Sequence, residues 1–360
     1  MQLVAMGAQD VYLTGNPQIT FFKVVYRRHT NFSKECIEQT FNGSVALGNT
    51  LNCTLSRNGD LIQEIYLKVE VTSDDGKTVT AKNLTHLIEH VEVEIGGQKI
   101  DKHYSQWFDI YNELFESNNK SREAMATPVL GTGVPAVDKT SCFVPLRFWF
   151  NRNPGLALPL IALQYHEVKI NLKVASTLTE GTLNSATLLV NYLYLDTDER
   201  RRFAQVSHEY LIEQVQHTGK ETKAKVTMNF NHPVKALFWR ADFAAATDTV
   251  LLQLNGHDRA AAQVHAYSQL VQPYECGLPA DPTIAQTRAV ANDVYTGMYS
   301  FCLKPAEHQP SGTCNFSRID NAVLNLGALG STNSGEAFVF ALNYNVLRIM
   351  SGMGGLAYSN

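Results

Sequence analysis

Cysteines in any regular spacing are absent from this chain of 360 residues, and so is an excess of basic charge. The net charge is −4, whereas a protein that reads duplex DNA normally carries a basic face. None of the six cysteines forms a C-x-x-C pair, which argues against a zinc site and against a dense disulfide framework. We predict free thiols in a reducing compartment for Cys36, Cys53, Cys142, Cys276, Cys302 and Cys314.

Long hydrophobic runs are also missing. A membrane-spanning helix needs about 20 continuous apolar residues, and the most apolar stretch, Gly155–Leu163, has about half that length and contains Pro159. The first ten residues, Met1–Asp10, carry no basic region and too short an apolar run for a signal peptide. The sequence therefore predicts a soluble protein made in a cytosol-like compartment.

Motifs that carry catalytic chemistry are scarce as well. His86-Leu-Ile-Glu-His90 fits the H-x-x-E-H pattern of some zinc proteases, but that chemistry needs both histidines on one helix face. The stretch runs instead into the strand-like alternation of Val91–Ile95. The glycine-rich Ser351–Gly355 lacks the lysine of a phosphate-binding loop. We predict no catalytic residue, no cofactor and no metal site, and hence a protein that is not an enzyme.

The residues that are present predict many short strands. Alternating or continuous apolar segments bounded by glycine, proline, asparagine and aspartate are typical of strands in an antiparallel fold. The expected strands are Leu61–Val71, Val91–Ile95, Cys142–Phe150, Val168–Val174, Leu188–Leu195, Val226–Phe230, Val234–Arg240, Val250–Leu254, Tyr295–Leu303, Ala322–Leu326 and Ala337–Ile349.

Only a few helices are expected. In Tyr104–Phe115, the apolar residues Trp107, Ile110 and Leu114 fall on one face at a spacing of three and four residues. Pro17–Arg28 begins with proline and ends with basic residues, the order that a short helix prefers. A third helix is expected near Ala260–Leu270.

The two halves of the chain show the same order of elements around a charged joint. A strand that ends on Gly96-Gly97 precedes one helix, and a strand that ends on Asn255-Gly256 precedes another. Between the halves lies Asp196–Gln205, whose clustered acids and arginines are too costly to bury unpaired. We therefore expect an all-β protein of two consecutive eight-stranded antiparallel jelly rolls with short helices in the connecting loops.

Four blocks of this sequence closely resemble major capsid proteins of nucleocytoplasmic large DNA viruses, as found in phycodnaviruses, mimivirus and iridoviruses. They are Gly7–Phe32, Ile95–Asp101, Asp196–Ala204 and Asn343–Ala357, and they span the chain from end to end. The resemblance implies a double jelly roll with a division into an N-terminal arm, a first jelly roll, a linker and a second jelly roll. These parts are expected at residues 1–30, 31–198, 199–205 and 206–360.

The resemblance also implies a structural role. Three copies would form a pseudo-hexameric homotrimeric capsomer, and capsomers would tile the icosahedral shell of a large double-stranded DNA virus after assembly in the host cytoplasm. Implied partners are further copies of the chain, neighbouring capsomers, and minor capsid and penton proteins, with no specific nucleic acid. The arm, with Arg27, Arg28 and His29, would lie at the inner face of the shell, near an inner virion membrane. Many relatives are longer, with large outer loops that this chain lacks.

Two other functions stay open at this point. A minor or scaffolding capsid protein with the same fold would differ from the major one in its abundance in purified particles. A carbohydrate-binding or hydrolytic β-sandwich protein would bind or cleave glycans as a monomer. Glycosylation sequons begin at Asn31, Asn42, Asn52, Asn83, Asn119 and Asn315. We attribute them to chance, because glycosylation at such sites requires passage through the secretory pathway.

Overall fold

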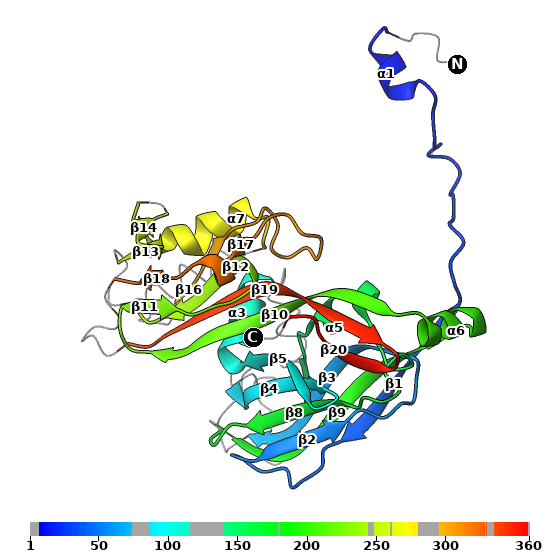
Figure 1. Cartoon of the computed structure of the whole chain (residues 1–360), viewed down its shortest axis with the longest axis horizontal. Helices are drawn as coiled ribbons and strands as arrows, with labels where there is room; N and C mark the ends of the chain where they lie inside the picture. The colour runs from blue at the N-terminus through cyan, green and yellow to red at the C-terminus, as the bar shows by residue number, and fades with distance from the viewer. Residues whose placement is uncertain are drawn as a thin grey trace. The chain divides into compact units, whose positions relative to one another are not determined.

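The chain divides into two compact units, residues 1–31 and 32–360, which are described separately. The computed structural model (Figure 1) describes residues 7–73, 86–115, 140–178, 181–243, 248–259, 261–279, 295–327, 329 and 335–358. Two of the sequon asparagines, Asn83 and Asn119, lie outside these residues.

The N-terminal unit has little regular structure. Its one helix among the described residues is α1 (Asp10–Thr14), which the sequence did not lead us to expect. The helix expected over Pro17–Arg28 is wrong: this segment is extended with a single turn. Its β-branched residues lower helix propensity, and every side chain in it is exposed, so no packing contact compensates. Large apolar side chains are left in solvent, namely Val11, Tyr12, Leu13, Ile19, Phe21, Phe22, Val24, Val25 and Tyr26.

The first half of the second unit forms two antiparallel sheets that we call the first sandwich. One sheet has the strand order β1-β9-β3-β6, with β7 paired to β3, and the other has the order β2-β8-β4-β5. This order is that of a jelly roll. The strands are β1 (Phe32–Thr40), β2 (Thr50–Thr54), β3 (Leu61–Ser73), β4 (Ile88–Ile95), β5 (Gln98–Tyr104), β6 (Thr140–Pro145), β7 (Leu158–Pro159), β8 (Val168–Val174) and β9 (Gly181–Leu195).

The second half repeats this arrangement as the second sandwich. Its sheets have the orders β10-β19-β12-β16 and β11-β18-β13-β14, which match the first sandwich strand for strand. The expected fold, two consecutive jelly rolls, is confirmed. The strands are β10 (His208–Glu221), β11 (Lys225–Met228), β12 (Pro233–Ala241), β13 (Thr249–Leu254), β14 (His257–Asp258), β15 (Gln263–Val264), β16 (Tyr295–Ser300), β17 (Cys314–Asn315), β18 (Ala322–Asn325), β19 (Ala337–Met350) and β20 (Met353–Leu356).

The expected alternation of side chains holds where a strand has one face in a core. Along β8 buried and half-buried residues alternate without a break, as they do over most of β4. The turns after two of the strands need a positive φ, which glycine and asparagine tolerate best. Gly96 and Gly97 have φ of 58° and 85°, and Asn255 and Gly256 have 52° and 78°.

Short helices lie in the connections, and none in the described residues is both long and apolar enough to cross a membrane. The strand expected over Cys142–Phe150 ends at Pro145, and a short helix follows from Trp149, with Phe148, Trp149 and Phe150 all buried. The third expected helix lies a few residues later than 260–270. The helices are α3 (Ser105–Leu114), α5 (Trp149–Arg152), η1 (Pro154–Leu156), α6 (Thr197–Gln205), η2 (Tyr267–Val271), α7 (Gln272–Glu275) and η3 (Phe316–Arg318).

Helix α6 occupies the charged joint. Asp196 caps it by accepting a hydrogen bond from the backbone N–H of Thr197 at 2.8 Å, and acidic residues fill its first turn. None of its residues is buried. One arginine reaches beyond the helix: Arg200 forms an ion pair of 3.0 Å with the buried Asp60 of the first sandwich.

Candidate functional site at the junction of the two sandwiches

The one motif with catalytic spacing does not lie on a single helix. Glu89 and His90 lie on strand β4, as the alternation that follows them predicted, so the motif has no helix face. His86 lies instead 2.7 Å from a carboxylate oxygen of Asp109 on α3. Within the ranges that the structure covers, no three histidine, cysteine, aspartate or glutamate residues group closely enough to hold a metal ion.

A set of buried polar and apolar contacts lies where the two sandwiches meet. Helix α3 belongs to the first sandwich in sequence, yet its buried Trp107, Ile110 and Leu114 pack in one cluster with residues of the β10-β19-β12-β16 sheet. The Trp107 ring lies edge-on to Phe238 at 5.5 Å and 5.8 Å from Phe340. The predicted apolar face of this helix is therefore confirmed, and it covers the second sandwich.

Polar contacts hold the same helix on that sheet. Asp109 forms an ion pair of 2.9 Å with Arg240 of β12, and both side chains are more than nine-tenths buried. One turn further, Glu113 accepts a hydrogen bond of 2.7 Å from the Thr296 hydroxyl of β16. Because an unpaired buried charge is costly, these contacts fix the orientation of α3 as well as its position.

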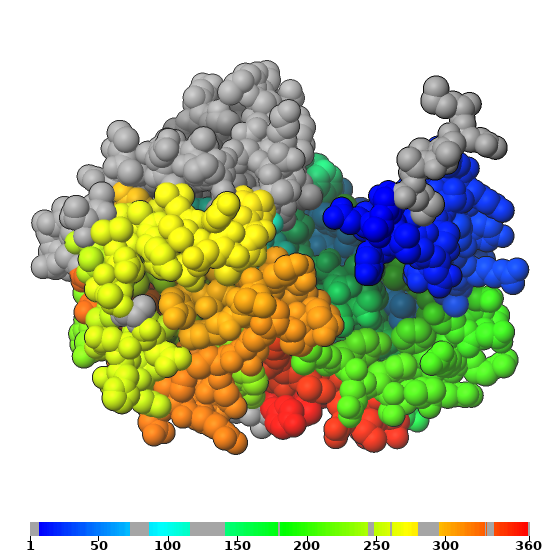
Figure 2. Space-filling model, turned by 90° about the horizontal axis from the view of Figure 1, so that it is seen from above, coloured from blue at the N-terminus to red at the C-terminus, as the bar shows by residue number. Residues whose placement is uncertain are grey.

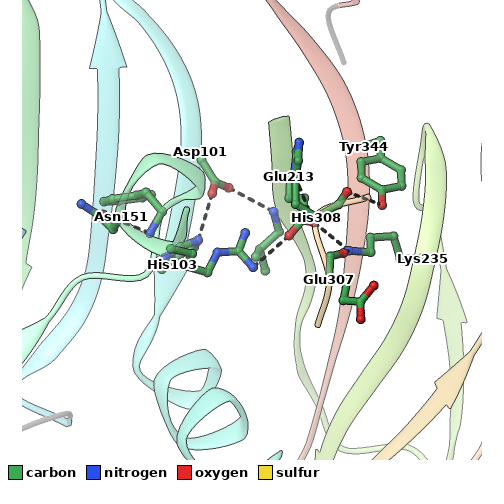
Figure 3. A network of polar contacts seen from close by, with 11 residues as sticks. Asp101, His103, Asn151, Glu213, Lys235, Glu307, His308 and Tyr344 are labelled. Atoms are coloured by element: carbon green, nitrogen blue, oxygen red, sulfur yellow. Dashed lines mark hydrogen bonds and ion pairs between the residues drawn. The ribbon is translucent and has the colours of Figure 1, made fainter. Parts of the chain in front are cut away.

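A second group of charges connects α5 of the first sandwich to the second sandwich (Figure 3). Glu213 of β10 binds two cations, Arg152 at 2.9 Å and Lys235 at 2.6 Å. Lys235 is fully buried. Its ammonium group also donates to the backbone carbonyl of Glu307 at 2.9 Å and lies 5.1 Å from the centre of the Tyr344 ring. Lys235 thus has three partners, as a buried ammonium requires.

His308 lies at the edge of this charge group. Its Nδ1 is 3.9 Å from a Glu213 oxygen. Burial lowers the pKa of His308, the Glu213 carboxylate offsets part of this effect, and the Lys235 ammonium adds to it. When His308 is neutral, the Glu213 carboxylate is shared between two cations, Arg152 and Lys235. Protonation of His308 would bring a third positive charge to the same carboxylate.

Strand β5 meets β10 through a buried carboxylate. One oxygen of Asp101 accepts hydrogen bonds from the backbone N–H groups of Lys102, at 2.9 Å, and Val215, at 3.0 Å. The other oxygen lies 2.9 Å from His103, whose ring stacks on Phe148 at 4.5 Å. Both members of the pair are almost completely buried. Through the contact with Val215, a carboxylate of the first sandwich accepts the hydrogen bond of a backbone N–H group of the second sandwich.

The C-terminal hairpin joins the two cores. Leu347 and Ile349 of β19, together with Ile212 of β10, belong to the hydrophobic cluster of the first sandwich. Figure 1 shows β19 and β10 running from the second sandwich to the first. In β20 the backbone N–H of Gly354 donates to His166 Nδ1 at 3.1 Å. A Cβ atom at Gly354 would lie 2.6 Å from the Leu163 side chain, so a larger residue here would require that side chain to shift.

Sequence reasoning found the α3 face but missed the charge groups. Lys235 stands in a strand whose neighbours are apolar, and Glu213 follows Leu211-Ile212. A lone charge inside such an apolar strand is a detectable signal for a buried ion. Its partner cannot be assigned from the sequence, because the two residues lie on different strands. The contacts of the junction pack the two sandwiches into one compact unit, the second unit of the chain.

A histidine at this junction predicts acid sensitivity. The ring of His217 lies between Tyr104, at 4.4 Å, and Phe340, at 4.5 Å. Burial, with a smaller effect of Lys102, lowers the pKa of His217 from 6.5 to about 4. The unfolded chain therefore binds this proton near pH 6.5 and the folded protein only near pH 4, so stability is expected to fall between these values by on the order of 2–3 kcal/mol.

This expectation is checked by measuring the free energy of unfolding against pH for the wild type and for His217→Phe. Other histidines with lowered pKa values remain in both proteins, so the difference between the two curves isolates His217. The wild type should lose more stability than the variant on acidification, and parallel curves would contradict the assignment.

Two jelly rolls on one chain, fused through a shared junction, define a viral double jelly-roll capsid protein. A family model described as "Major capsid protein N-terminus" matches residues 20–211. A second, described as "Large eukaryotic DNA virus major capsid protein", matches residues 199–249 and 241–355. The chain belongs to the family of major capsid proteins of large eukaryotic DNA viruses.

Similar proteins cover the whole chain. The chain is 55% identical to the major capsid protein of Pyramimonas orientalis virus and 43% identical to that of Paramecium bursaria Chlorella virus 1, over 100% of this chain and 99% of each relative. The alignments span 394 and 443 positions, so both relatives carry residues that this chain lacks. A structure of the PBCV-1 virus capsid matches with a TM-score of 0.81 and 37% identity, over 95% of this chain and 100% of that one. The Faustovirus major capsid protein, 12% identical with a TM-score of 0.72 over 96% and 94% of the two chains, shares the fold.

The family and these relatives are structural proteins, so the expectation that the chain is not an enzyme is confirmed. The chain is a component of the virion capsid and assembles with copies of itself into the shell.

Proposed function

We propose that the chain is the major capsid protein of its virus and that it assembles as a homotrimer with six lobes. The observation that carries this proposal is the repeated strand order, which gives each chain two equivalent lobes in one compact unit. Three such chains around a threefold axis supply six lobes, the number that a hexagonal tile needs. Closed cyclic symmetry pairs the contact surfaces of the three chains with one another, so each capsomer stops at three chains.

The jelly rolls of this proposal occupy residues 31–198 and 206–360, with residues 199–205 as the linker and residues 1–30 as the arm. The strand pairings support this division, because β1–β9 pair only among themselves and β10–β20 do the same. The division by contacts separates only residues 1–31 from the rest. The shared junction accounts for this, since it packs both jelly rolls into one unit.

Exposed apolar side chains support subunit contacts on the second sandwich. Leu270, Val271, Tyr274 and Leu303 are 38%, 39%, 83% and 74% exposed, and we call them the α7 patch. Figure 2 shows the η2–α7 segment (yellow) beside the segment that contains Leu303 (orange) on one face. Obligate interfaces are rich in apolar residues, so this patch fits a second copy of the chain within the trimer.

The N-terminal arm fits a different set of partners. From Gly7 onward it leaves nine large apolar side chains exposed, and it carries Lys23, Arg27 and Arg28. An exposed apolar segment with basic residues suits contact with neighbouring capsomers, with minor capsid and penton proteins, and with the inner face of the shell near a virion membrane. The sequon asparagines in the described residues, Asn31, Asn42, Asn52 and Asn315, are all exposed, and we propose that they remain unmodified.

Native mass spectrometry of the purified full chain tests the trimer. The wild type is expected at three times the monomer mass at micromolar concentration. Tyr274→Glu would place an unpaired charge in the buried interface and should weaken the trimer. The trimer should then dissociate at a concentration at least about tenfold higher than that of the wild type. A tenfold change corresponds to ~1.4 kcal/mol, which is less than the cost of burying an unpaired charge.

Tyr12→Glu in the arm is the matched control, and it should leave the trimer intact. A folded wild-type monomer at micromolar concentration would contradict the trimer. Equal behaviour of Tyr274→Glu and Tyr12→Glu would exclude the α7 patch from the interface. A minor or scaffolding role would appear as low abundance in purified particles, and glycan binding by a monomer would favour a carbohydrate-binding protein.

A further inference from the structure

Helix α3 and the η2–α7 segment occupy equivalent places in the two sandwiches. Helix α3 follows β5 and precedes β6, whereas η2–α7 follows β14 and β15 and precedes β16. The matching strand orders make β5 equivalent to β14 and β6 equivalent to β16. The two helical segments are therefore counterparts, and the surface on which α3 docks indicates where η2–α7 docks.

Helix α3 covers the outer face of the β10-β19-β12-β16 sheet. Leu237 of β12 lies in the core of the second sandwich, whereas its neighbour Phe238 lies in the cluster that contains α3. Phe238 is opposite Phe340 of β19 on one side and Met298 of β16 on the other. All three are completely buried. A helix of one sandwich thus covers an apolar group at the centre of the next sheet.

The β1-β9-β3-β6 sheet carries a similar apolar group on its outer face. Tyr66 of β3, the strand equivalent to β12, is opposite Leu189 of β9 and Pro145 of β6, and we call these three residues the β3 face. The preceding residue on each strand lies in the core of the first sandwich, so the three side chains point outward. Tyr66 and Leu189 are half-buried, and neither belongs to a hydrophobic cluster of the described residues.

We propose that the α7 patch of one copy docks on the β3 face of the next copy, in the way that α3 docks on the second sandwich within the chain. This contact rests on the homotrimer proposed above and names both surfaces of its interface. Helix α3 joins the first lobe of a chain to its second lobe, and the α7 patch joins that second lobe to the first lobe of the next chain. Three copies then close a ring in which the two kinds of contact alternate.

The charges of the two surfaces agree with this pairing. Arg240 lies two residues after the central aromatic residue of β12 and forms an ion pair of 2.9 Å with Asp109 of α3. Lys68 lies two residues after the aromatic residue of the β3 face, and Glu275 is exposed beside the α7 patch. The Lys68 ammonium lies 3.4 Å from the carboxylate of Glu38, which is 47% exposed. Glu275 of the next copy is therefore the counterpart of Asp109, and its charge is opposite to that of Lys68.

Native mass spectrometry of the full chain over a series of concentrations tests this contact. Leu189→Glu would place a charge in the apolar contact, so the trimer should dissociate at a concentration at least about tenfold higher than that of the wild type. Thr54→Glu is the matched control, because Thr54 is half-buried on the outer face of the other sheet of the first sandwich. It should leave the dissociation concentration unchanged. Circular dichroism verifies that both variants are folded.

A charge exchange identifies the two partners. Lys68→Glu and Glu275→Lys should each weaken the trimer, because each substitution places like charges opposite one another. The double variant should bind more tightly than either single variant, since the pair is restored with its signs reversed. If Leu189→Glu does not fold, this exchange decides alone.

Two results would overturn the docking while the homotrimer stands. One is a folded Leu189→Glu variant that trimerises like the wild type or like Thr54→Glu. The other is a double variant that trimerises no better than the single variants. A wild-type chain that stays monomeric at micromolar concentration would contradict the homotrimer itself, and the docking with it.

Discussion

Trp107→Ala is expected to destabilise the folded chain by about 3–5 kcal/mol. The Trp107 side chain is 1% exposed and contacts Phe238 and Phe340 of the second sandwich. Removing it leaves a cavity between α3 and the β10-β19-β12-β16 sheet. Because Asp109 and Glu113 hold this helix to the sheet through polar contacts, the helix cannot move inward to fill that space.

Urea unfolding followed by circular dichroism measures this cost, since the substitution removes a fluorescent residue. Ile110→Ala and Leu114→Ala should each cost about 2–5 kcal/mol for the same reason. Gln106→Ala is the control on the same helix, because its half-buried polar side chain fills no core position, and it should cost less than about 0.5 kcal/mol. A cost near zero for Trp107→Ala would mean that α3 does not pack on this sheet.

Glu213→Ala should cost about 3–5 kcal/mol, because it leaves two buried cations without their shared carboxylate. Lys235 is fully buried, and Arg152 is largely buried with its guanidinium 2.9 Å from the same side chain. Lys235→Met should cost less, about 1–2 kcal/mol, because Glu213 then keeps Arg152 and the methionine fills most of the vacated volume. The same urea experiment tests this asymmetry.

The control for this pair is an exposed ion pair of the same sheet. Arg348 and Glu209 lie 2.8 Å apart with 51% and 60% of their side chains exposed, so Glu209→Ala should change stability by less than about 0.5 kcal/mol. Equal costs for Glu213→Ala and Lys235→Met would show that Glu213 does not serve two cations.

The sequence predicted elements whose burial follows a simple period. Val168–Val174 alternates with the pleat of β8, and Trp107, Ile110 and Leu114 repeat with the turn of α3, so local pattern and structure agree. Pro17–Arg28 had the end residues of a helix but no apolar partner, and it is extended. The aromatic run Phe148–Phe150 is buried on all sides and carries no period at all.

The junction was harder to predict because its contacts join distant parts of the chain. Asp101 and Val215 are 114 positions apart, and the sequence contains no signal that pairs them. The end-to-end resemblance to capsid proteins predicted the double jelly roll. It did not predict that α3 packs on the second sandwich, or that the C-terminal hairpin enters the core of the first.

The position of Leu347 and Ile349 in the core of the first sandwich sets an order for folding during synthesis. These residues follow the whole first sandwich in the sequence, so the core of that sandwich stays incomplete until they have been synthesised. Chaperones that cover exposed apolar strands have their longest opportunity during this interval. A nascent chain that stops before β19 lacks core residues of both sandwiches.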